Sequence, residues 1–289
     1  MKVRKAVIPA AGLGTRMLPA TKTIPKEMLP LADKPSIQYI VEEAVEAGIE
    51  EILIITNRMK TAMDDYFDYH PELEEYLLRK GREEDAAIVR RTADLANVSY
   101  IRQKKTLGLG HAVWCAKHFV GNEPFAILLG DDIMLSKKPV IGQLIEAAQK
   151  SNCSAVGVKE VSDEAISRYC SLNVSPLYGN VLSVHDMIEK PKKEQIMSNY
   201  AILGRYVLTP DIFDILEHQT PGYGGEIQLT DALAKMARDT NMVAVDFEGT
   251  RFDTGSLTGY LEAMIELSLL NPKSEAWLKN YIRERAKTL

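Results

Sequence analysis

The chain has 289 residues, of which 46% are hydrophobic and 26% charged, and its formal net charge is −5, values that suit one large globular domain. The acidic balance provides no overall field to attract nucleic acid or an anionic membrane, so we expect neither as a partner and expect any anion site to be local. Three cysteines form no CxxC pair and no apolar run is long enough to span a membrane, so we expect a cytoplasmic protein without disulfides or structural zinc.

Strands and helices alternate in the predicted first half of the chain. Short apolar runs predict buried strands at residues 5–10, 51–56, 98–103 and 125–130. Apolar residues recur on one helical face over 35–48 and 139–151, and the charged stretch 60–97 predicts surface helices. Alternation of this kind indicates βαβ units and a mainly parallel sheet with helices on both faces.

The pattern changes in the second half of the chain. Two strands joined by a Pro/Gly turn are predicted over 170–190, and a strand followed by a helix that opens at Pro210 over 199–218. The remaining predicted elements are a helix at 227–240, a strand at 242–249 and a helical stretch at 256–288. We therefore predict an α/β fold: a single Rossmann-like domain with a mainly parallel mixed sheet, an inserted β-hairpin region and C-terminal helices.

A glycine-rich, basic segment directly follows the first predicted strand. Gly12 and Gly14 allow a backbone to approach a phosphate closely, and Arg16 and Lys26 add positive charge with which a phosphate can pair. The segment is neither GxGxxG nor GxxxxGK[ST], and its prolines keep it irregular, so a dehydrogenase and a P-loop enzyme are both disfavoured. The alternative is a surface loop with solvated charges, but the grouping of these residues with Glu27 behind a strand favours an anion site.

Carboxylates follow two other apolar runs. Asp131 and Asp132 come directly after the predicted strand at 125–130, and Asp253 follows a short apolar run in RFDTGS. Carboxylate oxygens at the carboxyl ends of strands suit Mg²⁺, which prefers oxygen ligands. Taken alone, the Asp131–Asp132 pair is better explained as a turn or a helix cap, which are common places for aspartate.

Three further segments carry polar residues in loops. In QKKTLGLGH, Gln103 can pair with a base edge and Gly108 permits close approach, whereas His111 is expected to be structural. In IEKP, Glu189 can accept hydrogen bonds from sugar hydroxyls and Lys190 can pair with a phosphate. The alternative for the first segment is a helix-entry loop. For IEKP, the residues alone favour an exposed charged turn.

The chain resembles the sugar-1-phosphate nucleotidylyltransferases. The motifs that carry this resemblance occur in the family's order over nearly the whole chain: AAGLGTRMLPATKTIPKEMLPLADKP, QKKTLGLGHAVWCAK, ILLGDDI, IEKP, GRYVLTPDIFDIL, GEIQLTDAL and FDTGS. The long TKTIPKEMLPL form is most similar to the bacterial uridylyltransferase branch of the family.

The resemblance implies a role for each matching residue. It assigns nucleotide binding to Ala11, Gly12, Gly14, Glu27, Gln103, Gly108 and Asp131. It assigns sugar-phosphate binding to Glu189, Lys190 and Glu226, and catalytic charge to Arg16, Lys26 and Lys190. It assigns Mg²⁺ binding to Asp131 and Asp253, with Asp131 favoured over Asp132 and a part for Asp132 left open.

The reaction implied is UTP plus α-D-glucose 1-phosphate giving UDP-glucose and pyrophosphate. A sugar-phosphate oxygen attacks the α-phosphorus of UTP in line. The second pKa of a phosphate monoester is about 6, so this nucleophile needs no general base at neutral pH.

The resemblance also divides the expected single domain of residues 1–289. Residues 1–135 form a nucleotide-binding half, 136–255 a sugar-phosphate-binding half, and 256–289 C-terminal helices. The apolar residues of these helices could either cover the core or form a subunit interface. Similar enzymes are homo-oligomers, so we expect a dimer or a tetramer.

One departure from the family pattern keeps alternatives open. Similar enzymes usually have glycine after SRY, near the sugar, whereas here Cys170 follows Tyr169. The alternatives are the same chemistry with another nucleotide such as dTTP, or with another sugar phosphate, and a non-catalytic regulatory relative. The presence of Arg16, Lys26, Asp131, Lys190 and Asp253 argues against the non-catalytic alternative.

Overall fold

The structure, a computed structural model, describes residues 1–288 and is built around one mixed nine-stranded sheet. The strands of this sheet are β1 (Lys5–Pro9), β4 (Glu51–Thr56), β5 (Asn97–Arg102), β6 (Phe125–Leu128), β8 (Ser154–Glu160), β9 (Cys170–Tyr178), β10 (Val181–Glu189), β11 (Tyr200–Leu208) and β12 (Met242–Asp246). They lie in the order β5-β4-β1-β6-β11-β8-β12-β10-β9. The predicted α/β fold with a mixed sheet is confirmed. The sheet is not mainly parallel as predicted, because β11 runs antiparallel to both β6 and β8, and the β9–β10 hairpin adds antiparallel pairs at one edge.

Parallel pairing is concentrated in the half of the sheet that contains β1. Strands β5, β4, β1 and β6 are parallel, as are β8 and β12, whereas the other neighbours in the order are antiparallel. The prediction of a buried strand at 98–103 was wrong in one respect. Strand β5 lies at the edge of the sheet, and all of its residues are exposed or half-buried.

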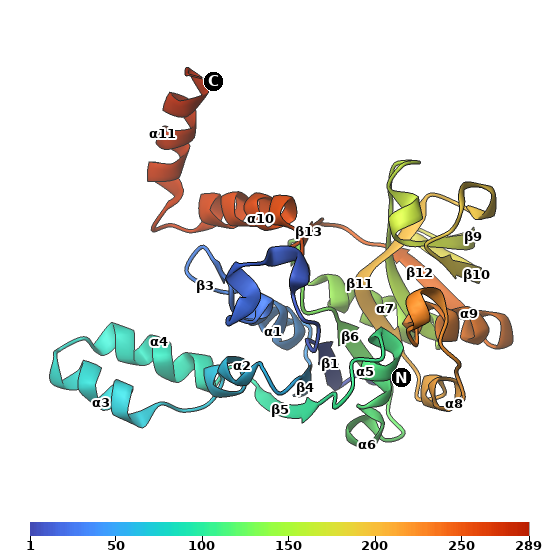
Figure 1. The fold of residues 1–289 in the computed structure, drawn as a ribbon, viewed down its shortest axis with the longest axis horizontal. Coiled ribbons are helices and arrows are strands. Elements are labelled where there is room, and N and C mark those ends of the chain that lie inside the picture. The colour runs from blue at the N-terminus through green and yellow to red at the C-terminus, as the bar shows by residue number, and fades with distance from the viewer. Residues whose placement is uncertain (289) are drawn as a thin grey trace.

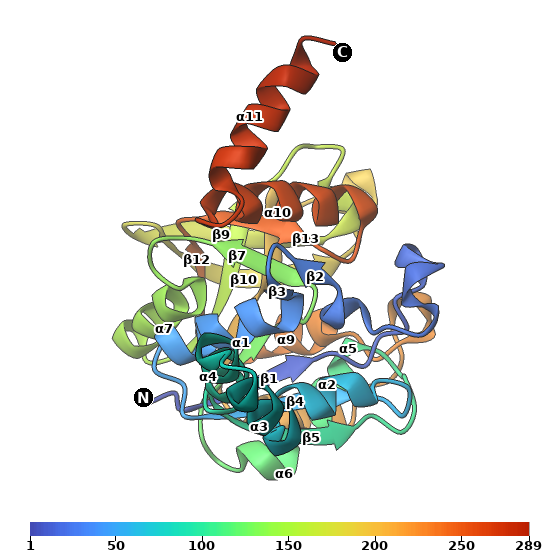
Figure 2. The ribbon, with the colours of Figure 1, turned by 90° about the vertical axis from the view of Figure 1, so that its left-hand side faces the viewer.

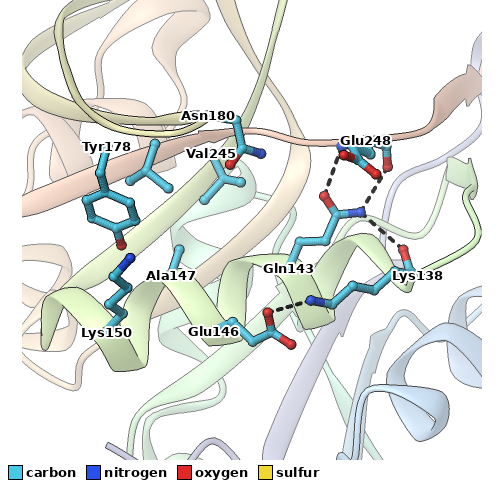
Figure 3. Close-up of a pocket in the computed structure, with 10 residues that line it drawn as sticks. Lys138, Gln143, Glu146, Ala147, Lys150, Tyr178, Asn180, Val245 and Glu248 are labelled. Atoms are coloured by element: carbon cyan, nitrogen blue, oxygen red, sulfur yellow. Dashed lines mark hydrogen bonds and ion pairs between the residues drawn. The ribbon is translucent and has the colours of Figure 1, made fainter.

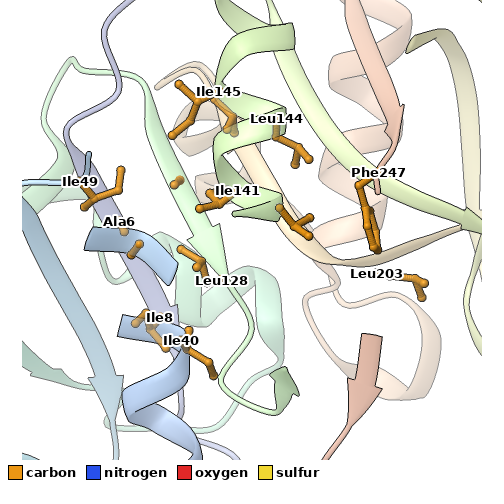
Figure 4. Packing of buried hydrophobic residues seen from close by; sticks show 14 of the residues in the cluster. Ala6, Ile8, Ile40, Ile49, Leu128, Ile141, Leu144, Ile145, Leu203 and Phe247 are labelled. Carbon is orange, nitrogen blue, oxygen red and sulfur yellow. The ribbon is translucent and has the colours of Figure 1, made fainter. Parts of the chain in front are cut away.

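Helices cover both faces of the sheet. The helices packed on it are α1 (Ser36–Glu46) and α7 (Val140–Ser151) on one face, and α5 (Leu109–Trp114), α8 (Ile212–Glu217) and α9 (Leu229–Asp239) on the other. Successive strand residues point to opposite faces, so Ala6 and Ile8 of β1 join the core under α1 and α7, whereas Val7 joins the opposite core. Figure 4 shows Ile8, Ile40 and Leu144 in the first of these cores.

Two groups of helices extend from this body. Between β4 and β5 the chain forms α2 (Thr61–Tyr66), α3 (Pro71–Arg79) and α4 (Glu83–Ala93), the surface helices predicted for 60–97. After the last strand it forms α10 (Leu257–Leu270) and α11 (Glu275–Ala286), and α11 projects away from the body (Figures 1 and 2). No helix within residues 1–288 has the length and apolar character needed to cross a membrane.

Strand β8 and four short strands were not predicted from the sequence. The short strands form two ladders, β2 (Pro30–Leu31) with β3 (Lys34–Pro35), and β7 (Asp132–Leu135) with β13 (Thr250–Asp253). In the second ladder, Asp253 lies opposite Asp132. This antiparallel pair therefore brings the DD and FDTGS motifs together, although more than a hundred residues of chain separate them.

A buried ion pair ties the helices on one face to the sheet. Arg205 of β11 is fully buried, and its Nη2 donates to Glu43 Oε2 at 2.6 Å and to the Asp132 carbonyl oxygen at 2.8 Å. Glu43 Oε1 accepts from the Ile141 backbone N–H at 2.9 Å. The pair thus connects α1, α7 and β11 with the start of β7, which lies beneath the carboxylates described next.

Candidate active site

A cleft of about 420 Å³ opens beyond the carboxyl end of β1. Its lining residues are Pro9, Ala11, Gly12, Leu13, Thr15, Lys26, Gln103, Thr106, Gly108, Leu109, Ala112, Leu129, Asp131 and Glu226. Seven of the residues predicted for the site are among them: Ala11, Gly12, Lys26, Gln103, Gly108, Asp131 and Glu226. A crevice beyond the carboxyl ends of parallel strands is where ligands bind in open α/β sheets.

The loop between β1 and the turn η1 (Thr15–Met17) requires glycine at one position. Gly14 has φ +67°, and a β-carbon there would lie 3.2 Å from the β-carbon of Thr21. Thr21 in turn donates its hydroxyl to the Gly14 carbonyl oxygen at 2.6 Å. The left-handed backbone and the close threonine together favour glycine, and the turn that follows places Arg16 over the carboxylates.

Arg16 and Lys26 are paired with the two predicted metal-binding carboxylates. Lys26 Nζ lies 2.5 Å from Asp131 Oδ2, and the guanidinium of Arg16 lies 3.6 Å from both Asp131 Oδ2 and Asp253 Oδ2. Burial alone would raise the pKa of Asp131, but Lys26 and Arg16 outweigh it, so the net pKa is lowered. Asp131 is therefore ionised at neutral pH, and each cation has a carboxylate partner that an incoming phosphate can replace.

The FDTGS segment is fixed against the DD motif by backbone contacts. Both the backbone N–H and the hydroxyl of Thr254 donate to the Asp131 carbonyl oxygen at 2.9 Å. Ser256 then caps α10, because its hydroxyl oxygen accepts from the Gly259 N–H at 3.2 Å. Together with the β7–β13 ladder, these bonds hold Asp253 beside Asp131. Thr254 and Ser256 were not singled out from the sequence.

Asp132 points away from the open cleft. Its side chain is buried, and Oδ1 accepts from Nε and Nη2 of Arg251 at 2.7 and 2.6 Å. Arg251 also donates to the Tyr169 hydroxyl oxygen at 3.1 Å. Burial raises the pKa of Asp132 to about 6, although the charge of Arg251 opposes this shift. Of the two adjacent aspartates, Asp131 is the one whose carboxylate is accessible.

The two accessible carboxylates converge on a space that glycine leaves free. A β-carbon on Gly255 would lie 2.7 Å from Asp131 Oδ2, 3.0 Å from Asp253 Oδ1 and 2.6 Å from Arg16 Nη2. Among residues 1–288, no three His, Cys, Asp or Glu side chains gather as a metal site. Two carboxylates, with the remaining ligands supplied by phosphate oxygens and water, are nevertheless a usual donor set for Mg²⁺. The residues present therefore fit a hard divalent cation.

Gly255→Ala is expected to lower turnover by up to about 100-fold, because displacement of catalytic groups by about 1 Å costs that much. The added methyl group would meet the side-chain ends of Arg16, Asp131 and Asp253 and push the two carboxylates apart. Steady-state rates at varied Mg²⁺ would show the loss, and the melting temperature should stay near that of the wild type. Gly142→Ala in α7, whose β-carbon would make only 3.6 Å contacts, is the matched control. Equal rates for the two variants would contradict the expectation.

The prediction that Glu27 contacts a nucleotide is not supported by its position. Its carboxylate has no exposed surface, and Lys60 Nζ donates to Oε1 at 2.9 Å and to Oε2 at 2.7 Å. Burial raises the pKa of Glu27, while the charges of Lys60 and Lys26 oppose the rise. This burial was missed from the sequence for two reasons. A glutamate in a polar, lysine-rich segment is expected to be exposed, and its partner Lys60 follows a different strand.

Gln103 and Gly108 also line the cleft. The side-chain amide of Gln103 donates to the Gly108 carbonyl oxygen at 3.1 Å and lies 2.9 Å from His111 Nδ1. Gly108 has φ +111°, and a β-carbon there would lie 2.7 Å from the Ile227 carbonyl oxygen. Burial lowers the pKa of His111, which favours the neutral ring that can accept from Gln103. His111 therefore orients Gln103, in keeping with the structural part expected of it.

The residues predicted for the sugar phosphate lie beside this cleft. Glu189 ends β10 and accepts from the Thr230 hydroxyl at 2.7 Å. Lys190 follows with φ +45°, and its Nζ lies 4.9 Å from the ring centroid of Tyr223. Tyr223 belongs to the turn η6 (Tyr223–Gly225), which leads directly to Glu226 in the wall of the cleft. One short segment thus connects the two groups of predicted residues.

The side chain of Cys170 does not project into open space. It pairs with Glu189 across the β9–β10 ladder, but it is only 4% exposed and belongs to the hydrophobic core beneath the sheet. Burial raises the pKa of the thiol, so the thiol stays protonated at neutral pH. The structure therefore offers no reason for Cys170 to obstruct a sugar bound above it.

A second cavity, of about 340 Å³, lies away from these residues, between α7 and the β9–β10 turn (Figure 3). Its polar groups are engaged with one another. Lys138 pairs with Glu146, Gln143 bonds the backbone of Glu248, and Lys150 lies over the ring of Tyr178. None of the residues predicted for the active site lines it.

The chain is similar to known proteins in both sequence and structure. Residues 5–268 match the family profile described as "Nucleotidyl transferase". The chain is 53% identical over 268 residues to a UTP–glucose-1-phosphate uridylyltransferase of Bacillus subtilis strain 168, covering 93% of this chain and 92% of that protein. It is 50% identical over 283 residues to the protein of the same name from Staphylococcus epidermidis strain RP62A, covering 98% of each chain.

Two solved structures show the same arrangement of the chain. A UTP-bound UGPase from Acinetobacter baumannii superposes with a TM-score of 0.91 at 39% identity, covering 98% of this chain and 99% of that one. A UDP-glucose pyrophosphorylase complexed with UDP-glucose superposes with a TM-score of 0.85 at 44% identity, covering 93% of this chain and all of that one.

Proposed function

The chain belongs to the nucleotidyl transferase family, and we propose that it transfers the uridylyl group of UTP to α-D-glucose 1-phosphate, giving UDP-glucose and pyrophosphate. The observation that carries this proposal is the arrangement of Arg16 and Lys26 against Asp131 and Asp253 at the nucleotide cleft. The relatives named uridylyltransferases, at 50% identity or more over most of their length, support this choice of substrates.

The chemistry requires positioning and charge neutralisation more than proton transfer. The sugar phosphate is mostly dianionic at neutral pH, because its second pKa is about 6, so its oxygen can attack the α-phosphorus of UTP directly. Gln103, Gly108 and the backbone of Ala11 and Gly12 would hold the base end of UTP. Arg16 and Lys26 would exchange their carboxylate partners for the triphosphate and then stabilise the leaving pyrophosphate.

The acceptor and the metal complete the proposed site. Lys190 would hold the attacking phosphate, with Glu189 and Glu226 directed to the sugar. Asp131 and Asp253 would hold Mg²⁺, which when bound supplies charge neutralisation at the reacting phosphates. In this scheme, residues 1–135 bind the nucleotide and residues 136–255 bind the sugar phosphate.

A homo-oligomer, formed through the C-terminal helices, belongs to the same proposal. Helix α11 contains no buried residue and, with α10, exposes large apolar side chains: Leu257, Leu261, Ile265, Leu270, Trp277, Tyr281 and Ile282. Apolar surface of this extent commonly marks a protein–protein interface.

Pyrophosphate release tests the substrate choice. Purified protein is incubated with Mg²⁺, glucose 1-phosphate and, in turn, UTP, dTTP, CTP, ATP or GTP. We expect release to be fastest with UTP and to be abolished by EDTA. Faster release with dTTP would show that the protein transfers a thymidylyl group and not a uridylyl group. If folded protein released no pyrophosphate with any nucleotide, the proposal would be overturned.

A further inference from the structure

Lys60 is a buried lysine that the proposed mechanism does not use. It follows β4 and precedes α2, and only 5% of its side chain is exposed. Its ammonium group donates to the Ala10 carbonyl oxygen at 2.6 Å and to the two carboxylate oxygens of Glu27 at 2.9 and 2.7 Å. All three N–H groups of the ammonium therefore have acceptors, as burial of a charged lysine requires.

These bonds join the segments that form the nucleotide cleft. Ala10 directly follows β1 and precedes Ala11 and Gly12, whereas Glu27 lies in the turn η3 (Lys26–Met28), adjacent to Lys26. The side chain of Glu27 also packs near Gly130, where a β-carbon would lie 3.4 Å from Glu27 Cγ. The Lys60–Glu27 pair thus lies where the β1 loop, the η3 turn and the approach to Asp131 meet.

Neighbouring side chains hold the same loop from the same side. Asn57, three residues before Lys60, donates its amide to the Ala11 carbonyl oxygen at 2.7 Å. The carbonyls of Ala10 and Ala11 are thus both fixed from beneath by the segment that follows β4. Fixing the carbonyls also fixes the orientation of the peptide N–H groups at Ala11 and Gly12, because each peptide unit is planar.

Stability alone does not explain this ion pair. Removing two charges from water costs about as much as their attraction returns, and apolar residues of similar size often serve as well or better. An apolar pair, however, could neither bond the Ala10 carbonyl nor keep a negative charge beside Lys26. Positive and negative charges alternate in a chain of neighbours, which are Lys60, Glu27, Lys26, Asp131 and Arg16. Burial lowers the pKa of Lys26, but the charges of Asp131 and Glu27 outweigh this effect and raise it.

We propose that Lys60 is a positioning residue for the nucleotide, fixing the Ala10–Gly12 backbone and, through Glu27, the turn that carries Lys26. The inference rests on the proposed function, since it assigns UTP to this cleft. It differs from the expected part of Glu27, which becomes a support for the cleft and not a ligand contact. Loss of the pair should therefore weaken UTP binding and leave the affinity for glucose 1-phosphate unchanged.

The test compares three variants with the wild type. Lys60→Met/Glu27→Leu removes both charges, so no buried charge is left unpaired. Lys60→Arg retains the charge and the donors, and Glu27→Gln retains an acceptor oxygen and the shape of the side chain. Calorimetric titration gives the UTP dissociation constant, and steady-state rates give kcat and the KM for each substrate.

The double variant is expected to bind UTP about tenfold or more weakly, the usual effect of losing hydrogen bonds to a charged group. Its KM for glucose 1-phosphate should stay within about twofold of the wild-type value, and Lys60→Arg should recover part of the UTP affinity. Arg90→Met is the matched control, because its partner Glu74 at 2.9 Å joins α3 to α4, away from the cleft. This control should bind UTP as the wild type does.

The UTP affinity of the double variant decides the inference when that variant folds. Wild-type UTP affinity in the folded double variant overturns the inference. If the double variant does not fold, Glu27→Gln decides, with weaker UTP binding expected and unchanged binding contradicting the inference. Wild-type protein that neither binds UTP nor releases pyrophosphate overturns the proposed function and this inference together, whereas an active wild type with an unaffected double variant overturns this inference alone.

Discussion

Lys190→Ala is expected to lower kcat by about 100-fold or more, the usual cost of removing a charged donor from a reacting group, while the UTP dissociation constant stays within about twofold. Lys190 lies beside the cleft proposed for the nucleotide but outside its lining, and its Nζ lies over Tyr223. In the proposed reaction it holds only the attacking phosphate. The nucleotide contacts proposed for Arg16 and Lys26 would survive its removal.

Separate measurements of UTP binding and turnover check this prediction. Calorimetry without the sugar phosphate reports nucleotide affinity, and pyrophosphate release reports turnover. Lys193→Ala is the control, because Lys193 is an exposed lysine on the turn that follows, with no assigned role. A parallel loss of UTP affinity and turnover in Lys190→Ala would show that Lys190 binds the nucleotide and would contradict the proposed division of the site.

Asp131→Asn is expected to lower turnover by at least about 100-fold at saturating Mg²⁺, because metal charge neutralisation is worth several kcal/mol in the transition state. The substitution keeps the shape of the side chain but removes the charge that pairs with Lys26 at 2.5 Å. An amide also offers a single, neutral oxygen to a hard cation. Rates measured over a range of Mg²⁺ concentrations would show a higher metal requirement.

A surface aspartate provides the control for charge removal. Asp186 pairs with Arg238 at 2.9 Å on the outside of the molecule, so Asp186→Asn should retain the wild-type rate.

Lowering the pH should also reduce turnover, but only where it protonates Asp131. Because the pKa of Asp131 is lowered, its carboxylate stays ionised on acidification until the pH falls below the ordinary aspartate range. A fully active Asp131→Asn enzyme would exclude Asp131 as a metal ligand.

The main strands and helices could be predicted from local sequence patterns. The spacing of Ile37, Ile40 and Ala44 anticipates the buried face of α1, and the runs KAVIP and FAIL become the buried strands β1 and β6. Alternation of such elements indicates a sheet covered on both faces, which is what forms. The loop behind β1 was also predicted as part of a site, because glycine and basic residues there have a local chemical meaning.

Other features depend on contacts between segments that are distant in the sequence. The β7–β13 ladder places Asp253 opposite Asp132, yet each of its strands has only four residues and carries little periodicity of its own. The burial of Glu27 depends on Lys60, and the edge position of β5 depends on the strand order. Residues such as Thr254 act through backbone contacts that composition does not predict.

The fate of labelled phosphorus tests most directly whether this site joins the two substrates. UTP labelled at the α-phosphorus and, separately, at the γ-phosphorus is incubated with the protein, Mg²⁺ and glucose 1-phosphate, and the products are separated. Transfer of the uridylyl group predicts that the α label appears in UDP-glucose and the γ label in pyrophosphate. Folded protein that leaves the α label out of UDP-glucose, or releases the γ label as single phosphate, would contradict the proposed reaction.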